Sequence, residues 1–340
     1  MLRRTFATTA AAAALAQERK PPVRFGVDLF SIRSQGWTPF QYLDYCAKWK
    51  AKVVHFSEIR FLGNLEPANL KRVRAHAEGL GMELEIGMRS ICPTSKSFDA
   101  SQGTADQQLL RMLESAKLIG SPIIRAFLGT MADRTGGVPI ESHIGNTAKV
   151  LKPLRSRFQD ANIRLAIENH AGDMQGRELK ALIEESGKDF VGACLDSGNP
   201  VWAIEDPHLT LETLAPYVLT SHIRDSAVWK TPDGIAVRWT RMGEGNVNIS
   251  GWVRRYAELC PGRALSLEII VTGPRTHKIY DPGFWEGYRK MPAWEFSRFL
   301  AFADRGTPSP YTPAPKEQAV EREREDLEAS ARWVHDYFKL

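Results

Sequence analysis

The chain has 340 residues, of which 43% are hydrophobic and 25% are charged, and its formal net charge is +5. This composition is typical of a globular protein, and the length suits one large α/β barrel with short additions. No stretch is long and apolar enough to cross a membrane. No run of Lys and Arg indicates a nucleic-acid-binding face. The composition therefore argues against a membrane-spanning protein and against a nucleic-acid-binding protein.

The first seventeen residues, MLRRTFATTAAAAALAQ, differ in texture from the rest of the chain. Arg3 and Arg4 precede an Ala/Thr-rich stretch, and Ala14-Leu15-Ala16 has the small-x-small pattern of a cleavage site. The segment resembles a twin-arginine export signal. We therefore expect residues 1–17 to be a signal peptide and the mature protein to be periplasmic or exported. An unstructured Ala-rich terminus is the alternative.

From residue 23 onward, short apolar runs alternate with stretches typical of helices. Several of the helical stretches start at Pro, Thr or Ser and end at Gly, as capped helices do. The apolar runs lie near 23–32, 53–58, 83–91, 123–129, 163–170, 191–197, 218–225 and 264–271. Eight strand–helix units, with the last helix near 291–306, predict an α/β fold, a (β/α)8 barrel over residues 23–306. A doubly wound sheet is the alternative, but no Gly-x-Gly-x-x-Gly follows the first strand.

A Pro-rich linker, GTPSPYTPAPK, follows Arg305. The segment after it reads as an amphipathic helix whose apolar face includes Val320, Leu327, Val334 and Phe338. Such a face needs a partner surface. We therefore expect residues 307–340 to form a C-terminal helical extension that packs on the outside of the barrel or on a second subunit, so a homo-oligomer is possible.

Four of the predicted strands carry a polar residue at the carboxyl end of their inward face. In the fifth run, Ile163, Leu165 and Ile167 share one parity, while Ala166 and Glu168 share the other. Side chains alternate between the two faces of a strand, so the aliphatic set can face the helices and the other set the barrel interior. In the fifth to eighth runs the inward sets end with Glu168, Asp196, His222 and Glu268.

The spacing of these four residues agrees with a barrel. Glu168 and Asp196 are 28 positions apart and Asp196 and His222 are 26 apart, close to the roughly 31 residues of one barrel unit. His222 and Glu268 are 46 apart, which predicts an insertion after the seventh strand. The carboxyl ends of the strands form the face where barrel enzymes place their chemistry.

Three carboxylates and an imidazole in one barrel mouth repel each other unless a cation compensates their charge. The sequence therefore predicts one divalent metal ion. Ligation rich in oxygen favours Mg²⁺ or Mn²⁺, and one imidazole keeps Co²⁺ and Zn²⁺ possible. The predicted metal ligands are Glu168, Asp196, His222 and Glu268.

The segments ENH, LDSGNP, SHIRD, GEG and SLEI, in this order, resemble the xylose isomerase-like superfamily of sugar isomerases and epimerases over about residues 23–305. The resemblance implies one divalent metal, most often Mn²⁺, on the four residues named above. In the ketose epimerases of that family the two glutamates also form the acid–base pair, which implies catalytic roles for Glu168 and Glu268. The implied reaction on a small carbohydrate is proton removal next to a carbonyl, with a metal-stabilised enediolate.

Two positions depart from the pattern of the ketose 3-epimerases. Those enzymes usually carry His three residues after the metal Asp, where this chain has Asn199. They usually carry Arg six residues after the metal His, where this chain has Val228. A lyase of the same superfamily, inosose dehydratase-like or cleaving 3-keto-glycosides by β-elimination, therefore remains an alternative. A non-catalytic exported sugar-binding protein is the third reading, although pure binding needs no paired glutamates.

Further polar residues fall at or just beyond the predicted strand ends, or in the insertion after the seventh strand. Structural roles are the alternative for some of them. Glu58, Arg89 and Arg125 could form a buried ion network, and His170 could make a structural hydrogen bond. The candidate substrate-binding residues are Glu58, Arg89, Arg125, His170, Asn199, Arg224, Arg238 and Glu244.

Export through the twin-arginine route predicts that the mature protein begins near Gln17. Replacing Arg3→Lys and Arg4→Lys together should leave uncleaved protein in the cytoplasm, because the arginine pair is the recognised feature. Cell fractionation and N-terminal sequencing measure this. Cytoplasmic, full-length protein that the double replacement leaves unchanged would exclude the signal.

Overall fold

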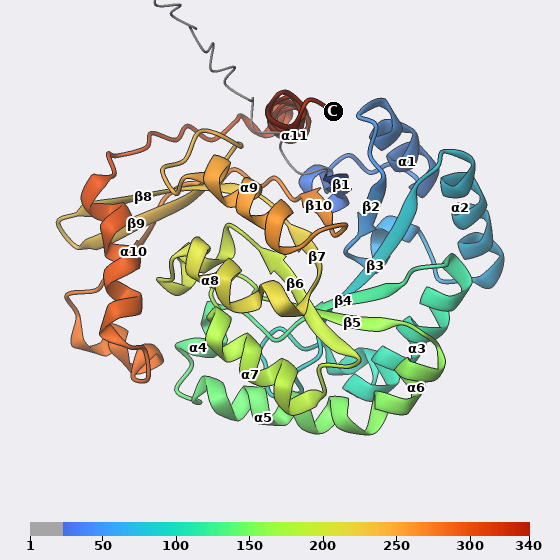
Figure 1. The fold of residues 1–340 in the computed structure, drawn as a ribbon, viewed down its shortest axis with the longest axis horizontal. Coiled ribbons are helices and arrows are strands. Elements are labelled where there is room, and N and C mark those ends of the chain that lie inside the picture. Colours follow the sequence, from blue (N-terminus) through green and yellow to red (C-terminus); the bar gives the residue numbers. More distant parts are fainter. Residues whose placement is uncertain (1–22) are drawn as a thin grey trace, which may run out of the picture.

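The computed structural model describes residues 23–340, so the expected signal peptide lies outside the described residues. Its centre is a sheet of eight parallel strands in the order β10-β1-β2-β3-β4-β5-β6-β7 (Figure 1). Hydrogen bonds from Ile223 N to Ser266 O (2.8 Å) and from Glu268 N to Ile223 O (3.1 Å) join the two edges. The strands are β1 (Arg24–Asp28), β2 (Val53–Phe56), β3 (Glu83–Ser90), β4 (Ile123–Phe127), β5 (Arg164–Glu168), β6 (Val191–Asp196), β7 (Val218–His222) and β10 (Ala264–Leu267). The predicted barrel and its eight strands are confirmed.

Helices surround this sheet and begin where the sequence supplies caps. Thr38 and Gln41 form a capping box at the start of α1, and Thr104 and Gln107 form one at α3. Gly120, at φ +77°, ends α3 in the left-handed conformation that favours glycine. The helices are α1 (Pro39–Lys48), α2 (Pro67–Gly79), α3 (Ala105–Ile119), α4 (Met131–Arg134), α5 (Ile140–Leu151), α6 (Arg155–Asp160), α7 (Gly176–Ser186), α8 (Pro207–Leu214), α9 (Ile249–Leu259), α10 (Ala293–Arg305) and α11 (Ala319–Phe338).

The insertion after β7 is an antiparallel hairpin of β8 (Asp225–Thr231) and β9 (Gly234–Thr240), to which β11 (Arg275–His277) adds a third strand. The spacing from His222 to Glu268 predicted this insertion, but its strands were not predicted. A hairpin could have been predicted, because Asp233-Gly234 separates two runs of alternating apolar residues. Val228 and Val237 of the hairpin pack with Phe299 of α10 in a separate apolar cluster.

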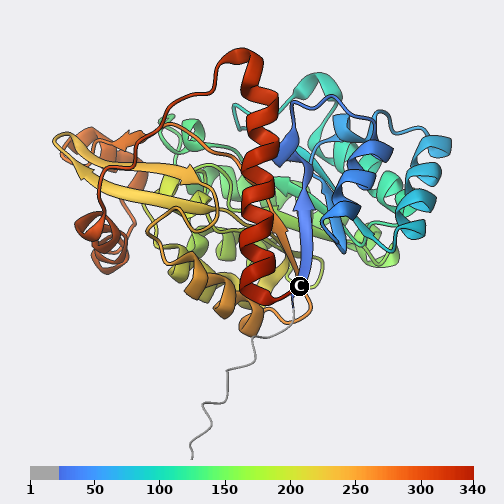
Figure 2. The same cartoon turned by 90° about the horizontal axis from the view of Figure 1, so that it is seen from above.

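The helix expected to be the eighth of the barrel, α10, packs against β8 of this hairpin instead. The last helix, α11, lies between α1 and α9 along β1 and β10 (Figures 1 and 2). Tyr45 of α1 donates a hydrogen bond to Glu328 (3.0 Å), and Tyr337 donates one to Ser250 O at the start of α9 (2.9 Å). The C-terminal helix is therefore part of the barrel wall, as its apolar face required.

The aliphatic residues of the strands face the helices and form the main core, as their parity predicted. Leu219 is an exception, since the register between β6 and β7 shifts at Ala193/Cys194 and Leu219 joins Ile123 and Ala166 in an interior cluster. Among the described residues, no helix has the length and apolar character needed to cross a bilayer.

Two valines of α11 test its packing, because Val334 is fully buried and Val320 is 40% exposed. We expect Val334→Ala to lower the free energy of unfolding by about 1.5–3 kcal/mol. The control Val320→Ala should change it by less than about 0.5 kcal/mol. Urea denaturation measures both, and equal effects of the two substitutions would contradict this position of α11.

Candidate functional site

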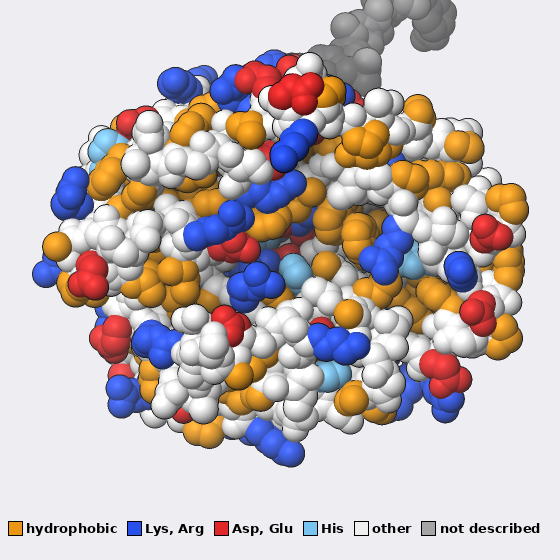
Figure 3. All heavy atoms as spheres, turned by 180° about the vertical axis from the view of Figure 1, so that it is seen from behind, with side chains coloured by type: hydrophobic (Ala, Val, Ile, Leu, Met, Phe, Trp, Pro, Cys, Tyr) orange, Lys and Arg blue, Asp and Glu red, His pale blue; other side chains and the backbone are white. Residues whose placement is uncertain are grey.

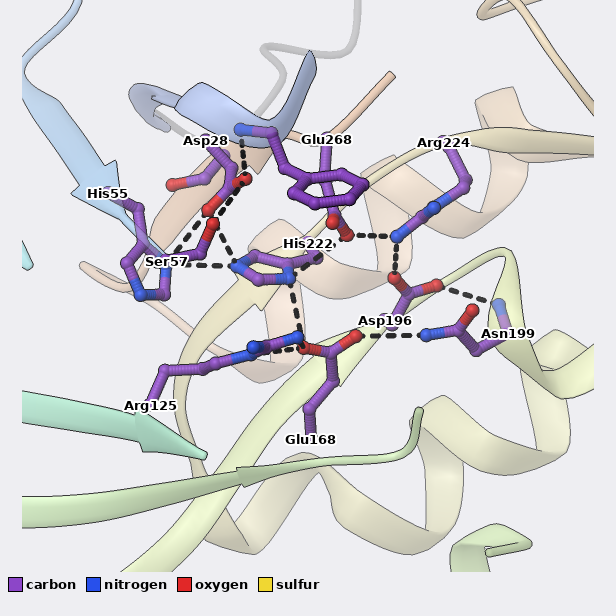
Figure 4. Close-up of polar contacts among 12 residues, drawn as sticks. Asp28, His55, Ser57, Arg125, Glu168, Asp196, Asn199, His222, Arg224 and Glu268 are labelled. Atoms are coloured by element: carbon purple, nitrogen blue, oxygen red, sulfur yellow. Dashed lines mark hydrogen bonds and ion pairs between the residues drawn. The ribbon is translucent and has the colours of Figure 1, made fainter. Parts of the chain in front are cut away.

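The four residues predicted from the strand ends meet at the carboxyl end of the barrel. Glu168, Asp196 and His222 end β5, β6 and β7, and Glu268 directly follows β10. One ligand atom of each lies within 4.8 Å of those of the others. All four side chains are buried, Glu268 being the most exposed at 5%. They lie in the region drawn in Figure 4, and Figure 3 shows a central hollow lined by charged side chains on this face.

The imidazole of His222 is the centre of the cluster. Its Nδ1 lies 3.2 Å from a carboxylate oxygen of Glu168 and 3.1 Å from one of Glu268, and this buried nitrogen has no hydrogen-bond partner. Burial lowers the pKa of His222, but Cys194 and the carboxylates of Glu268, Glu168 and Asp28 together outweigh burial and raise it well above its ordinary value. The carboxylates therefore draw positive charge to Nδ1, from a proton or from a metal ion. This donor set fits a divalent metal.

The other ring nitrogen of His222 is held by residues of β1 and β2. Its Nε2 lies 2.9 Å from Nδ1 of His55 and 3.3 Å from Oδ2 of Asp28. Asp28 is fixed in turn, because its Oδ1 accepts hydrogen bonds from Ser57 Oγ (2.9 Å) and Phe30 N (2.8 Å). Burial, together with His222, lowers the pKa of His55 to about 3, so neutral His55 can accept a hydrogen bond from Nε2–H. Such an outer partner leaves Nδ1 free to act as a ligand.

Asp28 and His55 were not among the sequence candidates. Asp28 is the last residue of β1 and points inward, so the alternation of side chains along β1 could have identified it as a site residue. His55 lies inside β2 rather than at its end, so its position in the strand gave no such indication. Their contact with His222 depends on how the barrel closes.

Two buried arginines neutralise part of the negative charge. Arg125 donates from Nε to Glu168 Oε2 (2.5 Å), and Arg224 pairs through Nη2 with both Asp196 and Glu268. Burial alone would raise the pKa of each glutamate. Arg224 and His222 nevertheless hold that of Glu268 at about 2, and Arg125 and His222 hold that of Glu168 well below its ordinary value.

Asp196 behaves differently from the two glutamates. Its burial and the nearby carboxylates outweigh Arg224 and raise its pKa to about 7. The arginines therefore compensate the cluster only in part, and a cation among these carboxylates would stabilise their ionised form.

Asn199 also lies in the cluster, at the start of the 3-10 helix Asn199–Ala203. Its side chain donates to Glu168 Oε1 (2.9 Å). Its backbone N–H and that of Gly198 both donate to Asp196 Oδ1, each at 2.7 Å. Asn199 therefore fixes the orientation of two of the four residues.

His170 lies two positions after Glu168, and its contacts are with the loop after β4 and with Phe127. Its Nδ1 lies 2.7 Å from Gly129 O, and its ring stacks on Phe127 with the centroids 3.9 Å apart. Arg125 also lies over the Phe127 ring, 4.9 Å from its centroid. His170 therefore supports the loop after β4 and the ring beneath Arg125.

Two early candidates lie away from the cluster. Arg89 is exposed, because the register of β3 with β4 shifts between Gly87 and Ser90, and its charge acts on Asp99 in the following loop. Glu58 pairs with the half-exposed Arg60 at 2.5 Å. The structure therefore does not bring Arg89 and Glu58 to the four strand-end residues.

Arg238 and Glu244, the two candidates from the insertion, line a cavity of about 500 Å³ between the hairpin and α11. Arg238 donates to Ser309 Oγ (3.2 Å) and lies over the ring of Tyr311. Glu244 lies 4.0 Å from Arg241. Arg238 therefore joins the hairpin to the Pro-rich linker, whereas Glu244 lies beside Arg241 just after the hairpin.

Comparison with known proteins agrees with the barrel fold. A family model described as "Xylose isomerase-like TIM barrel" matches residues 43–283. Among curated proteins, 3-oxo-isoapionate decarboxylase of Pectobacterium atrosepticum is 29% identical over 185 residues, which are 54% of this chain and 60% of that protein. The chain therefore matches less than two thirds of the length of this relative.

Solved structures share the fold at low identity. A xylose isomerase domain protein from Planctomyces limnophilus has a TM-score of 0.62 and 13% identity, with 94% of this chain and 98% of that chain covered. The IolI protein with a zinc atom has a TM-score of 0.58 and 14% identity, with 94% and 100% covered. These similarities concern the fold.

The buried pair of Arg125 and Glu168 predicts a large effect of its disruption. Arg125→Met should lower the free energy of unfolding by about 3–5 kcal/mol, because it leaves the Glu168 carboxylate buried without its counter-ion. The control Arg60→Met, which removes the exposed pair with Glu58, should cost about 0–1 kcal/mol. Urea denaturation with a chelator present measures both. A loss below 1 kcal/mol for Arg125→Met would show that the pair does not stabilise the site.

Proposed function

Because the chain belongs to the xylose isomerase-like TIM barrel family, we propose that it is a metal-dependent enzyme acting on a carbohydrate hydroxyketone. We propose an isomerase or epimerase whose first step removes a proton from the carbon next to the carbonyl. The observation that carries the proposal is the approach of Glu168 and Glu268 to the unpartnered Nδ1 of His222. A site for sugar binding alone has no need of two such carboxylates.

Glu168, Asp196, His222 and Glu268 would hold one divalent ion, with Mn²⁺ as our first choice and Mg²⁺, Co²⁺ and Zn²⁺ as alternatives. When bound, the ion would polarise the substrate carbonyl and stabilise the negative charge that develops during proton removal. His55 and Asp28 would keep the His222 ring in the orientation that binds it.

The two glutamates come from different sides of the mouth, β5 and the end of β10, which suits proton transfer on two faces of a substrate. Their low pKa values keep both ionised, the state in which a carboxylate accepts a proton. Arg125 and Asn199 each hold one oxygen of Glu168, so this carboxylate is fixed. Glu268 is paired through Oε2 to Arg224 and His222. We propose that one ionised glutamate removes the proton, and that the other, after it has taken up a proton from solvent, delivers that proton to carbon.

A lyase or decarboxylase is the second candidate, and the similarity to 3-oxo-isoapionate decarboxylase favours it. Loss of carbon dioxide from a 3-oxo acid leaves the same negative charge next to a carbonyl as proton removal does. The same site residues could therefore serve either reaction. An isomerase or epimerase returns a proton to carbon at once, whereas a lyase or decarboxylase first expels a leaving group or carbon dioxide.

We further propose that the enzyme acts after export, because residues 1–17 resemble a twin-arginine signal. This proposal requires that the protein carry its metal and fold before transport, since that route moves folded proteins.

The chemistry is tested in D₂O with Mn²⁺-loaded protein and a panel of ketoses, inososes and 3-keto-glycosides followed by NMR. An isomerase or epimerase should place solvent deuterium on the carbon next to the carbonyl. Glu168→Gln and Glu268→Gln should each slow the exchange by at least about 10²-fold, since general acid–base catalysis contributes 10²–10⁴-fold. The control Glu114→Gln, in an exposed pair with Lys117 on α3, should not.

Two outcomes would decide against the preferred reaction. An unsaturated product, a released aglycone or carbon dioxide would favour the second candidate. A rate near that of the wild type in either glutamine variant, with the metal bound, would exclude the two-glutamate mechanism.

A further inference from the structure

Arg224 is a buried residue of the site with two side-chain nitrogens that have no hydrogen-bond partner among the described residues. It follows β7 directly and is 1% exposed. Its Nη2 contacts both Asp196 and Glu268. Its Nε and Nη1 are buried and have no hydrogen-bond partner among the described residues. Leaving buried N–H groups unpaired is costly, so such groups call for an explanation.

Arg125 provides the comparison within the same site. Its Nε and Nη2 both contact Glu168, and its Nη1 donates to Met88 O (3.3 Å). All three nitrogens of Arg125 are therefore engaged by the protein, which makes it a counter-ion of Glu168. Arg224 is also buried but leaves two of its three nitrogens without a hydrogen-bond partner.

The surroundings of Arg224 are shaped to hold its side chain in place. A Cβ at position 198 would overlap Cγ and Cδ of Arg224, so glycine is required there. The guanidinium carbon lies over the ring of Trp239, 4.5 Å from its centroid. Trp239 is fixed by a hydrogen bond from Nε1 to Gly198 O (3.0 Å) and by stacking on Trp202 at 4.3 Å. A guanidinium held in this way loses little freedom when it binds a ligand.

We propose that the substrate carries a carboxylate and that Arg224 binds it, so that the substrate class is keto sugar acids rather than neutral ketoses. This inference rests on the proposed function, because Arg224 would bind the acid group in the same site, beside Asp196 and Glu268, where the reaction is proposed to occur. A buried guanidinium pairs best with an anion. All three nitrogens of Arg125 are engaged by the protein, whereas Arg224 pairs through Nη2 alone and keeps Nε and Nη1 for the ligand. One such cation suits the single charge of a carboxylate better than a phosphate, which recruits several donors.

The test compares 2-keto-D-gluconate with D-fructose, which differ only in a carboxylate or a hydroxymethyl group at C1, and adds D-fructuronate, with its carboxylate at C6. Isothermal titration calorimetry with Mn²⁺-loaded protein gives the affinities. At least one acid should bind about tenfold or more tightly than D-fructose, as one charge-assisted hydrogen bond supplies. Failure of both acids to bind more tightly than D-fructose would overturn the proposal.

Variants then assign the preference to the residue. Arg224→Gln should abolish the preference for the acid while the bound Mn²⁺, measured by elemental analysis, stays at the wild-type ratio. Arg224→Lys should keep part of the preference, because it keeps the charge. The control Arg322→Gln, half-exposed on α11, should keep all of it. A preference that survives in Arg224→Gln would overturn the proposal.

These measurements are separate from the test of the reaction, since binding needs no turnover. Binding of an acid through Arg224 without glutamate-dependent deuterium exchange would refute the proposed function and leave the inference in place. Glutamate-dependent exchange on neutral ketoses with no preference for acids would do the reverse.

Discussion

The site depends on one electrostatic constraint, the burial of three carboxylates around a single imidazole. Glu168, Asp196 and Glu268 converge on His222 at a place with almost no exposure to water. Carboxylates this close destabilise one another unless positive charge lies among them. Arg125 and Arg224 supply part of that charge, but the pKa of Asp196 is still raised to about 7. The other residues of the site hold positive charge, from arginine or from a metal ion, beside these carboxylates.

The barrel meets this constraint with groups from several of its strands. Asp28 and His55, from β1 and β2, reach the far nitrogen of His222, while the carboxylates approach its near nitrogen. The hairpin of β8 and β9 places Trp239 over Arg224, and α11 completes the wall beside β1 and β10. The segments around the seventh and eighth strands therefore also fix Arg224, whose Nε and Nη1 have no hydrogen-bond partner among the described residues.

Much of this could be predicted from the sequence. The alternation around Glu168 and the spacing to Asp196 and His222 predicted which side chains would meet, because parallel strands end on the same face. Arg89 was misplaced because a shift in the register of β3 is invisible to parity. The contact of His55 with His222 joins residues 167 positions apart, and only closure of the barrel creates it. The apolar face of α11 predicted that the helix would be covered, but an amphipathic pattern does not identify the groove that covers it.

The central claim is that these four strand-end residues hold one divalent cation. The direct measurement is anomalous scattering from crystals of the protein grown with Mn²⁺, collected at the manganese absorption edge. We expect one strong peak per chain, within coordination distance of Glu168, Asp196, Glu268 and Nδ1 of His222. Manganese bound elsewhere with no peak at this position, or a peak unchanged when His222 is replaced by alanine, would contradict the account.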